Sequence, residues 1–177
     1  MKKSNIRSVC TISLFAATIS IMAQFSIPLP FGVPLSLQNF AVVLAAILLG
    51  KKNGTLAVLV YLFLGLVGLP VFSNFRSGLQ TLASPTGGFL LGYPLMTYLM
   101  GIGVEHRHQK GLFPLFMFLG YFIDYLSGLL IFCLSTSTGI QIGIVTCVLP
   151  FLPAELVKSI LAGILGLRLH KRLFSYL

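Results

Sequence analysis

The stretch SVCTISLFAATISIMAQFSIPLPFGVPLSLQNFAVVLAAILLG, residues 8–50, contains no charged side chain. A charge-free run of this length is enough for two crossings of a bilayer, each of about 20 residues. Proline and glycine cluster at positions 28–34, where an uninterrupted helix would not tolerate them. The stretch therefore predicts two membrane helices, at about residues 9–27 and 35–50, joined by a loop that dips toward the membrane.

The composition of the whole chain extends this interpretation. Of 177 residues, 56% are hydrophobic and only 8% are charged, too few to dress the surface of a water-soluble fold of this size. Further apolar segments predict helices at about 55–69, 89–103, 112–133 and 153–169. We therefore expect an all-α membrane protein, a bundle of six transmembrane helices formed by one domain over residues 1–177.

The positive charges predict how the bundle is oriented. The net charge is +9, but the basic residues flank apolar segments and form no face interleaved with exposed aromatic side chains, so a nucleic-acid partner is not expected. On the six-helix topology, ten of the twelve Lys and Arg residues fall on one side, and the exceptions are Arg76 and Lys158. The positive-inside rule places both termini in the cytoplasm of a multi-pass protein of the cell membrane.

A long polar and aromatic loop, residues 71–88, is predicted on the outer face. Loops of this length in compact chains are usually functional or disordered, and the aromatic content argues against disorder. Arg76 lies in it close to Asn74 and offers a counter-charge to a ligand carboxylate, while Asn74 offers hydrogen bonds. The alternative is a solvated loop arginine.

Glu155 and Lys158 form the strongest single feature. They lie three residues apart in an otherwise apolar helix, where each charge costs about 2.5–3.5 kcal/mol at mid-membrane, so such residues usually face a cavity and serve a function. The first turn of a helix also favours a carboxylate. We expect both to bind a ligand, with a purely structural ion pair as the alternative.

Asp124, within the fifth predicted helix, is open to two interpretations. It is either a proton-relay or substrate-binding carboxylate, or a protonated or locally hydrogen-bonded acid. His106 and His108 lie two apart in a charged loop and lack the spacing of a helical metal pair, so no metal site is expected.

Two sets of small residues predict close contacts. The glycines of SPTGG, residues 84–88, include Gly87 and allow a ligand or a neighbouring segment to approach the backbone. Ala16, Ser20 and Ala23 form a small-residue stripe on one face of the first helix. We expect this stripe to dock a partner subunit, and the alternative is packing against another helix of this chain.

Five segments together resemble the BioY family, the biotin-specific substrate-capture (S) components of energy-coupling factor (ECF) transporters. They are AQFSIPLPFG (23–32), VPLSLQ (33–38), GLVGLPVF (65–72), SPTGGFLLG (84–92) and LPFLPAELVK (149–158). Two positions depart from the family pattern. Glu155 stands where the family usually has Asp, and Ala16 with Ser20 stands where it usually has Ala-x-x-x-Ala.

The resemblance implies a subunit that binds biotin with high affinity in an outward-facing cavity, and that is not itself an enzyme. It implies Asn74, Arg76, Gly87, Glu155 and Lys158 as substrate-binding residues. It also implies a transmembrane coupling subunit and ABC-type ATPases as partners, which alone use ATP, and no cofactor. The alternatives are an S component for thiamin or riboflavin, or a small membrane enzyme that uses Glu155, Lys158 and Asp124 in acid–base catalysis.

Overall fold

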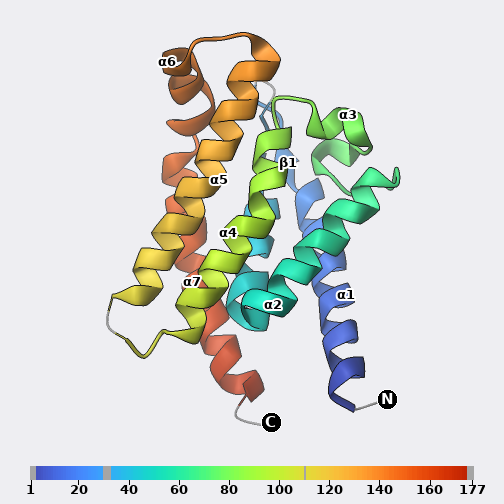
Figure 1. Ribbon diagram of the computed structural model, residues 1–177, viewed down its shortest axis with the longest axis vertical. Helices are drawn as coiled ribbons and strands as arrows, with labels where there is room; N and C mark the ends of the chain where they lie inside the picture. The colour runs from blue at the N-terminus through green and yellow to red at the C-terminus, as the bar shows by residue number, and fades with distance from the viewer. Residues whose placement is uncertain (1–2, 30–32, 110, 175–177) are drawn as a thin grey trace.

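Five long helices form the body of the protein in a computed structural model, which describes residues 3–29, 33–109 and 111–174 (Figure 1). They are α1 (Lys3–Gln24), α2 (Gln38–Leu66), α4 (Gly87–Glu105), α5 (Leu112–Thr136) and α7 (Leu152–Phe174). The short elements are the strands β1 (Ser26–Ile27) and β2 (Leu35–Ser36), the 3₁₀ turn η1 (Ser73–Phe75), the helices α3 (Leu79–Leu82) and α6 (Ile140–Gly143), and the π-helical turn η2 (Ile144–Val148). The prediction of an all-α protein is confirmed.

Four described helices are long and apolar enough to cross a membrane: Ile6–Gln24, Gln38–Leu66, Gly87–Glu105 and Leu112–Thr136. The segments Ile140–Val148 and Leu152–Leu169 make a fifth if the pair, bent by 48°, counts as one span. The elements α6 and η2 are too short to span a membrane alone, and the bend leads from them into α7. Pro153 lies in the first turn of α7, where proline is well tolerated.

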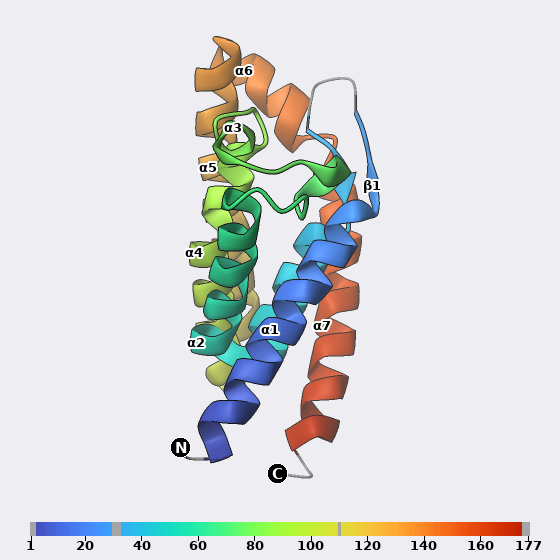
Figure 2. The ribbon, with the colours of Figure 1, turned by 90° about the vertical axis from the view of Figure 1, so that its right-hand side faces the viewer.

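The predicted count of six spans is not confirmed, because the second and third predicted helices are the two arms of α2. Only Gly50 inside α2 leaves helical geometry, with φ of 73°, and both views show α2 doubling back on itself (Figures 1 and 2). Residues 51–54, which lie between the second and third predicted helices, are themselves helical, since the single glycine with a positive φ reverses the chain. The arms Gln38–Leu49 and Lys51–Leu66 are about 18 and 24 Å long, shorter than a hydrocarbon core of about 30 Å.

Small residues let the helices approach closely. A Cβ on Gly54 would lie 2.9 Å from the carbonyl oxygen of Ala45. The two arms of α2 therefore pack closely because Gly54 has no side chain. Gly88 and Gly92 hold α4 against α5, because a Cβ on Gly88 would lie 2.3 Å from the carbonyl oxygen of Ser127. The two glycines, four residues apart on α4, thus allow close contact between the helices.

The stripe on α1 is buried inside the chain. Ala16 and Ala23 are 1% and 0% exposed, and α1 packs on α2. The Ser20 hydroxyl donates to the Ala16 carbonyl oxygen at 2.8 Å. The structure therefore shows packing of this face within the chain, and docking of a partner subunit on it stays a prediction. Lipid gives helices little hydrophobic reason to associate, so small residues serve internal contacts equally well.

The two ends of the molecule differ in character. Figures 1 and 2 show the N-terminus, the C-terminus, the bend of α2 and the α4–α5 connection at one end. The paired strands β1 and β2, the loop between α2 and α4, and α6 lie at the opposite end. The first end carries the basic segments that the positive-inside rule predicts on one side, including Lys51, whose Nζ pairs with the Glu105 carboxylate at 2.9 Å.

Candidate functional site

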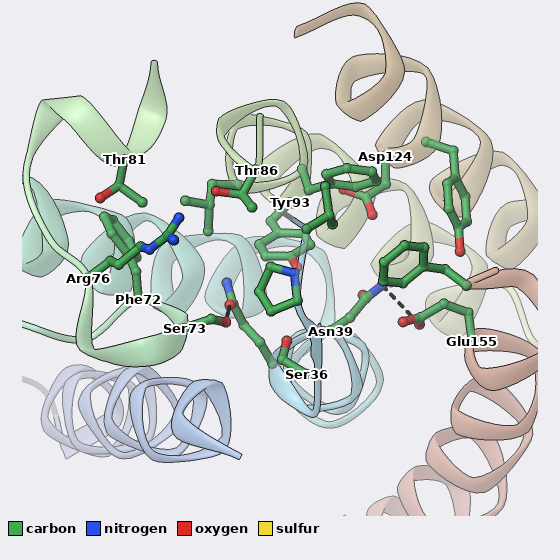
Figure 3. Close-up of a pocket in the computed structure, with 17 residues that line it drawn as sticks. Ser36, Asn39, Phe72, Ser73, Arg76, Thr81, Thr86, Tyr93, Asp124 and Glu155 are labelled. Atoms are coloured by element: carbon green, nitrogen blue, oxygen red, sulfur yellow. Dashed lines mark hydrogen bonds between the residues drawn. The ribbon is translucent and has the colours of Figure 1, made fainter. Parts of the chain in front are cut away.

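A cavity opens at the end of the bundle opposite the termini, where six segments meet (Figure 3). The contributing segments are the approach to α2 at residues 33–39, the loop at 72–86, the start of α4, the middle of α5, Phe151 and the first turn of α7. Its apolar lining consists of Val33, Pro34, Phe72, Phe89, Leu90 and Phe151. The charged side chains lie on opposite sides of the cavity, Arg76 on one side and Asp124 and Glu155 on the other, so the cavity suits a ligand with two polar ends.

Glu155 forms the acidic region of the cavity. It is 8% exposed and lies in the first turn of α7. The Asn39 amide nitrogen donates to Glu155 Oε2 at 3.0 Å, and Lys158 Nζ donates to Glu155 Oε1 in an ion pair. Lys158 Nζ also donates to the carbonyl oxygen of Ser36 at 2.8 Å. Lys158 itself does not line the cavity, and from behind Glu155 it fixes the position of the carboxylate relative to the approach to α2.

Arg76 supplies the positive charge of the cavity. In Figure 3 it lies across the cavity from Glu155. Its carbonyl oxygen accepts from the Phe72 amide at 3.0 Å, which closes a tight bridge in the loop. Among the described residues the guanidinium has no ion-pair partner, so its donors remain available for an anionic group.

Two other predicted site residues shape the loop without lining the cavity. Asn74 is exposed, adopts φ of 61°, and its side-chain oxygen accepts from the Ser26 hydroxyl at 2.9 Å. Gly87 starts α4 so close to α3 that a Cβ would lie 1.7 Å from the carbonyl oxygen of Leu82. The close approach predicted for the SPTGG turn is therefore made to a neighbouring segment.

Several buried polar atoms around the cavity lack a hydrogen-bond partner within the described residues. They are Gln38 Nε2, Asn39 Oδ1, Asp124 Oδ1 and the Tyr125 hydroxyl. Buried polar groups are normally paired, so these atoms are available to a polar ligand. Asn39 and Tyr125 were not expected in the site from the sequence, although Asn39 is a polar residue in an apolar helix, a signal that usually marks a functional site in membranes.

The long loop is ordered by two anchors. Phe72 is 1% exposed and meets Tyr61 edge to face with ring centroids 5.6 Å apart. A Cβ on Gly65 would lie 2.1 Å from the Phe72 ring, so the absence of a side chain there creates its seat. Gln24 is the second anchor, because its amide nitrogen donates to the Val71 and Phe72 carbonyl oxygens, and its oxygen accepts from the Phe75 amide at 3.0 Å.

Replacing Gln24 by alanine should loosen this loop. Each lost hydrogen bond contributes about 1 kcal/mol, and the backbone groups of the loop would lose their partner. We expect trypsin to cleave after Arg76 faster in purified Gln24→Ala than in the parent, as measured by mass spectrometry of the fragments. Gln80→Ala is the matched control, because Gln80 is exposed in α3 of the same segment and its side chain makes no hydrogen bond with described residues. Equal cleavage rates in all three proteins would contradict the anchoring role.

The described residues contain no group of three or more His, Cys, Asp or Glu side chains that could hold a metal ion. His106 and His108 are exposed at the end of the bundle remote from the cavity.

Comparison with known proteins gives a consistent set of relatives. A model of the BioY family matches residues 1–175. The chain is 38% identical over 168 residues to a "Biotin transporter BioY" of Thermotoga maritima, covering 93% of this chain and 96% of the relative. It is 35% identical to a "Probable biotin transporter BioY" of Pyrococcus horikoshii, with the same coverage of both chains. The crystal structure of an "S-component for biotin from an ECF-type ABC transporter" superposes with a TM-score of 0.87 at 26% identity, over 97% of this chain and 95% of that one.

Proposed function

The chain belongs to the BioY family, a family of transport proteins and not of enzymes, and from this membership we propose that it is the biotin-binding membrane subunit of an ECF-type vitamin uptake transporter. The observation that carries the proposal is the cavity with Arg76 facing Glu155 across apolar walls. Biotin has the complementary layout, with a carboxylate at the end of an aliphatic chain and a cyclic urea at the other end of the molecule.

Each part of biotin has a counterpart in the cavity. The Arg76 guanidinium binds the carboxylate through charge-assisted hydrogen bonds. Phe89 and Phe151 pack on the aliphatic chain and the sulfur-containing ring. The Glu155 carboxylate accepts from a ureido N–H group, and Gln38 Nε2, which has no partner within the described protein, can donate to the ureido carbonyl oxygen.

The remaining predicted site residues then act indirectly. Lys158 positions Glu155 through the ion pair and the bond to Ser36. Asn74 and Gly87 hold the loop and the start of α4 in the conformation that presents Arg76. We include these residues in the substrate site on that basis.

In this function, partner subunits would supply the energy for transport. A transmembrane coupling subunit and ABC-type ATPases would use ATP, and this chain would form one membrane domain with no cofactor. The support comes from the related S component, whose title places it in an ECF-type ABC transporter. The orientation follows the basic residues, with both termini cytoplasmic and the cavity open to the outside.

The direct test is saturable binding of radiolabelled biotin to membrane vesicles from a host that lacks biotin transporters and ECF coupling proteins. We expect right-side-out vesicles to bind biotin at once, and inside-out vesicles to bind it only after detergent is added. Isothermal calorimetry on the purified chain should then give one site per chain. Binding of thiamin or riboflavin with none for biotin would overturn the proposed ligand, and immediate binding by inside-out vesicles alone would overturn the orientation.

A further inference from the structure

Asp124 is a second acidic side chain of the cavity and belongs to a different helix from Glu155. It lies at the middle of α5, is 1% exposed, and lines the cavity. Figure 3 shows Asp124 and Glu155 directed into the same part of the cavity from α5 and α7. The absence of a side chain at Gly92 makes room for it, because a Cβ there would lie 2.8 Å from Asp124 Oδ1.

One of the two interpretations of Asp124 was an acid with a local hydrogen bond, and the described residues show no such bond to its side chain. Oδ1 has no hydrogen-bond partner among the described residues. The nearby Ser127 hydroxyl donates to the Asp124 backbone carbonyl oxygen at 3.0 Å and not to its side chain. The hydroxyl of Tyr125, the next residue, is also without a partner. An unsatisfied buried acid in a membrane helix is costly, so a ligand that satisfies it would bind more tightly.

The shape of a cyclic urea requires acceptors on two sides. Its two N–H bonds point away from each other on either side of the carbonyl group, so a single carboxylate cannot align with both. Each Glu155 oxygen already accepts one bond from the protein, from Asn39 and from Lys158. Asp124 Oδ1 accepts none.

Resting on the proposed function, we infer that Asp124 is a specificity-determining residue that accepts a hydrogen bond from one ureido N–H group of biotin, while Glu155 accepts from the other. The two acids thereby hold the ureido ring between α5 and α7. A ligand with an apolar substituent at the nitrogen facing Asp124 would leave this acid unpaired and clash with it.

The test compares biotin with its two mono-N-methyl ureido derivatives by calorimetry on purified protein. In Asp124→Ala, the affinity for biotin should fall by at least about tenfold, since the hydrogen bond from the ureido N–H group to the carboxyl group is lost. In the parent, both methylated derivatives should bind more weakly than biotin. In Asp124→Ala, the derivative methylated at the nitrogen that faces position 124 should bind within about threefold of biotin, because alanine leaves room for the methyl group. The other derivative should still bind more weakly than biotin to Asp124→Ala, as it does to the parent. Asp124→Ser makes the same space and replaces Asp124→Ala if that variant does not fold.

Thr97→Ala is the matched control. Thr97 is fully buried on α4, bonds only to the Tyr93 carbonyl oxygen at 2.7 Å, and does not line the cavity. It should leave the relative affinities of the three ligands unchanged. If the Asp124 variants bind the three ligands in the same ratios as the parent, Asp124 does not contact the ureido group and the inference is overturned. Failure of the parent to bind biotin would instead overturn the proposed function.

Discussion

Glu155→Ala should weaken biotin binding by well over tenfold. The substitution removes the acceptor for a ureido N–H group and leaves Lys158 Nζ with the Ser36 carbonyl oxygen as its one remaining partner among the described residues. Both side chains of the pair are about nine-tenths buried, and truncating one partner of such a pair typically costs about 2–5 kcal/mol. Lys158→Ala should have an effect of similar size, because Glu155 would lose the group that holds it in place. Calorimetry on the purified variants measures both effects.

Two further variants separate ligand recognition from general damage. Glu155→Asp keeps the carboxylate and should retain binding. Glu105→Ala breaks the more exposed ion pair with Lys51 at the other end of the molecule and should leave affinity unchanged, since pairs of that kind contribute about 0–1 kcal/mol. If Glu155→Ala and Lys158→Ala fold normally and bind biotin as the parent does, the pair is structural and the assignment of Glu155 to the site is wrong.

The second large effect is expected from Gly88→Ala, on stability. A Cβ at this position would lie 2.3 Å from the Ser127 carbonyl oxygen and 2.8 Å from the Gly128 Cα. Backbone atoms cannot rotate out of the way, so α4 and α5 would have to separate, at a cost of about 1–3 kcal/mol or more. Because both helices line the cavity, biotin affinity should fall together with the melting temperature in detergent.

Gly163→Ala is the control for this experiment. Gly163 lies within α7, and no heavy atom lies within 4 Å of its added Cβ. Alanine is also the better helix former, so this variant should melt at the parent temperature or slightly above it. A Gly88→Ala protein as stable as Gly163→Ala would show that the α4–α5 contact tolerates a wider spacing.

The helices were largely predictable because apolar length is a strong signal, whereas the bend in α2 was not. Lys51 and Lys52 inside a helix looked like a loop, since two charges and Asn53-Gly54 interrupt the apolar pattern. The structure needs only Gly50 for the reversal. A sequence shows that glycine permits a positive φ, but not that the chain uses it.

The site was predictable in its charges and not in its neutral groups. Arg76 and Glu155 stood out because charges are expensive in or near a membrane, and both line the cavity. Asn39 and Tyr125 gave a weaker signal, because neutral polar and aromatic side chains are common in membrane helices. The stripe of Ala16 and Ala23 carried no information about which helix would cover it, and the fold covers it with α2.

The reversal of α2 brings both ends of one broken helix to the cavity end of the molecule. Its first arm begins with Gln38 and Asn39 at the cavity, and its second arm ends near Gly65, where the Phe72 ring is seated. The arms meet at Gly50, at the far end of the molecule, and Gly54 against Ala45 keeps them close. One helix therefore supplies Gln38 and Asn39 to the cavity and also seats the Phe72 ring that lines it, although its reversal lies at the far end of the molecule.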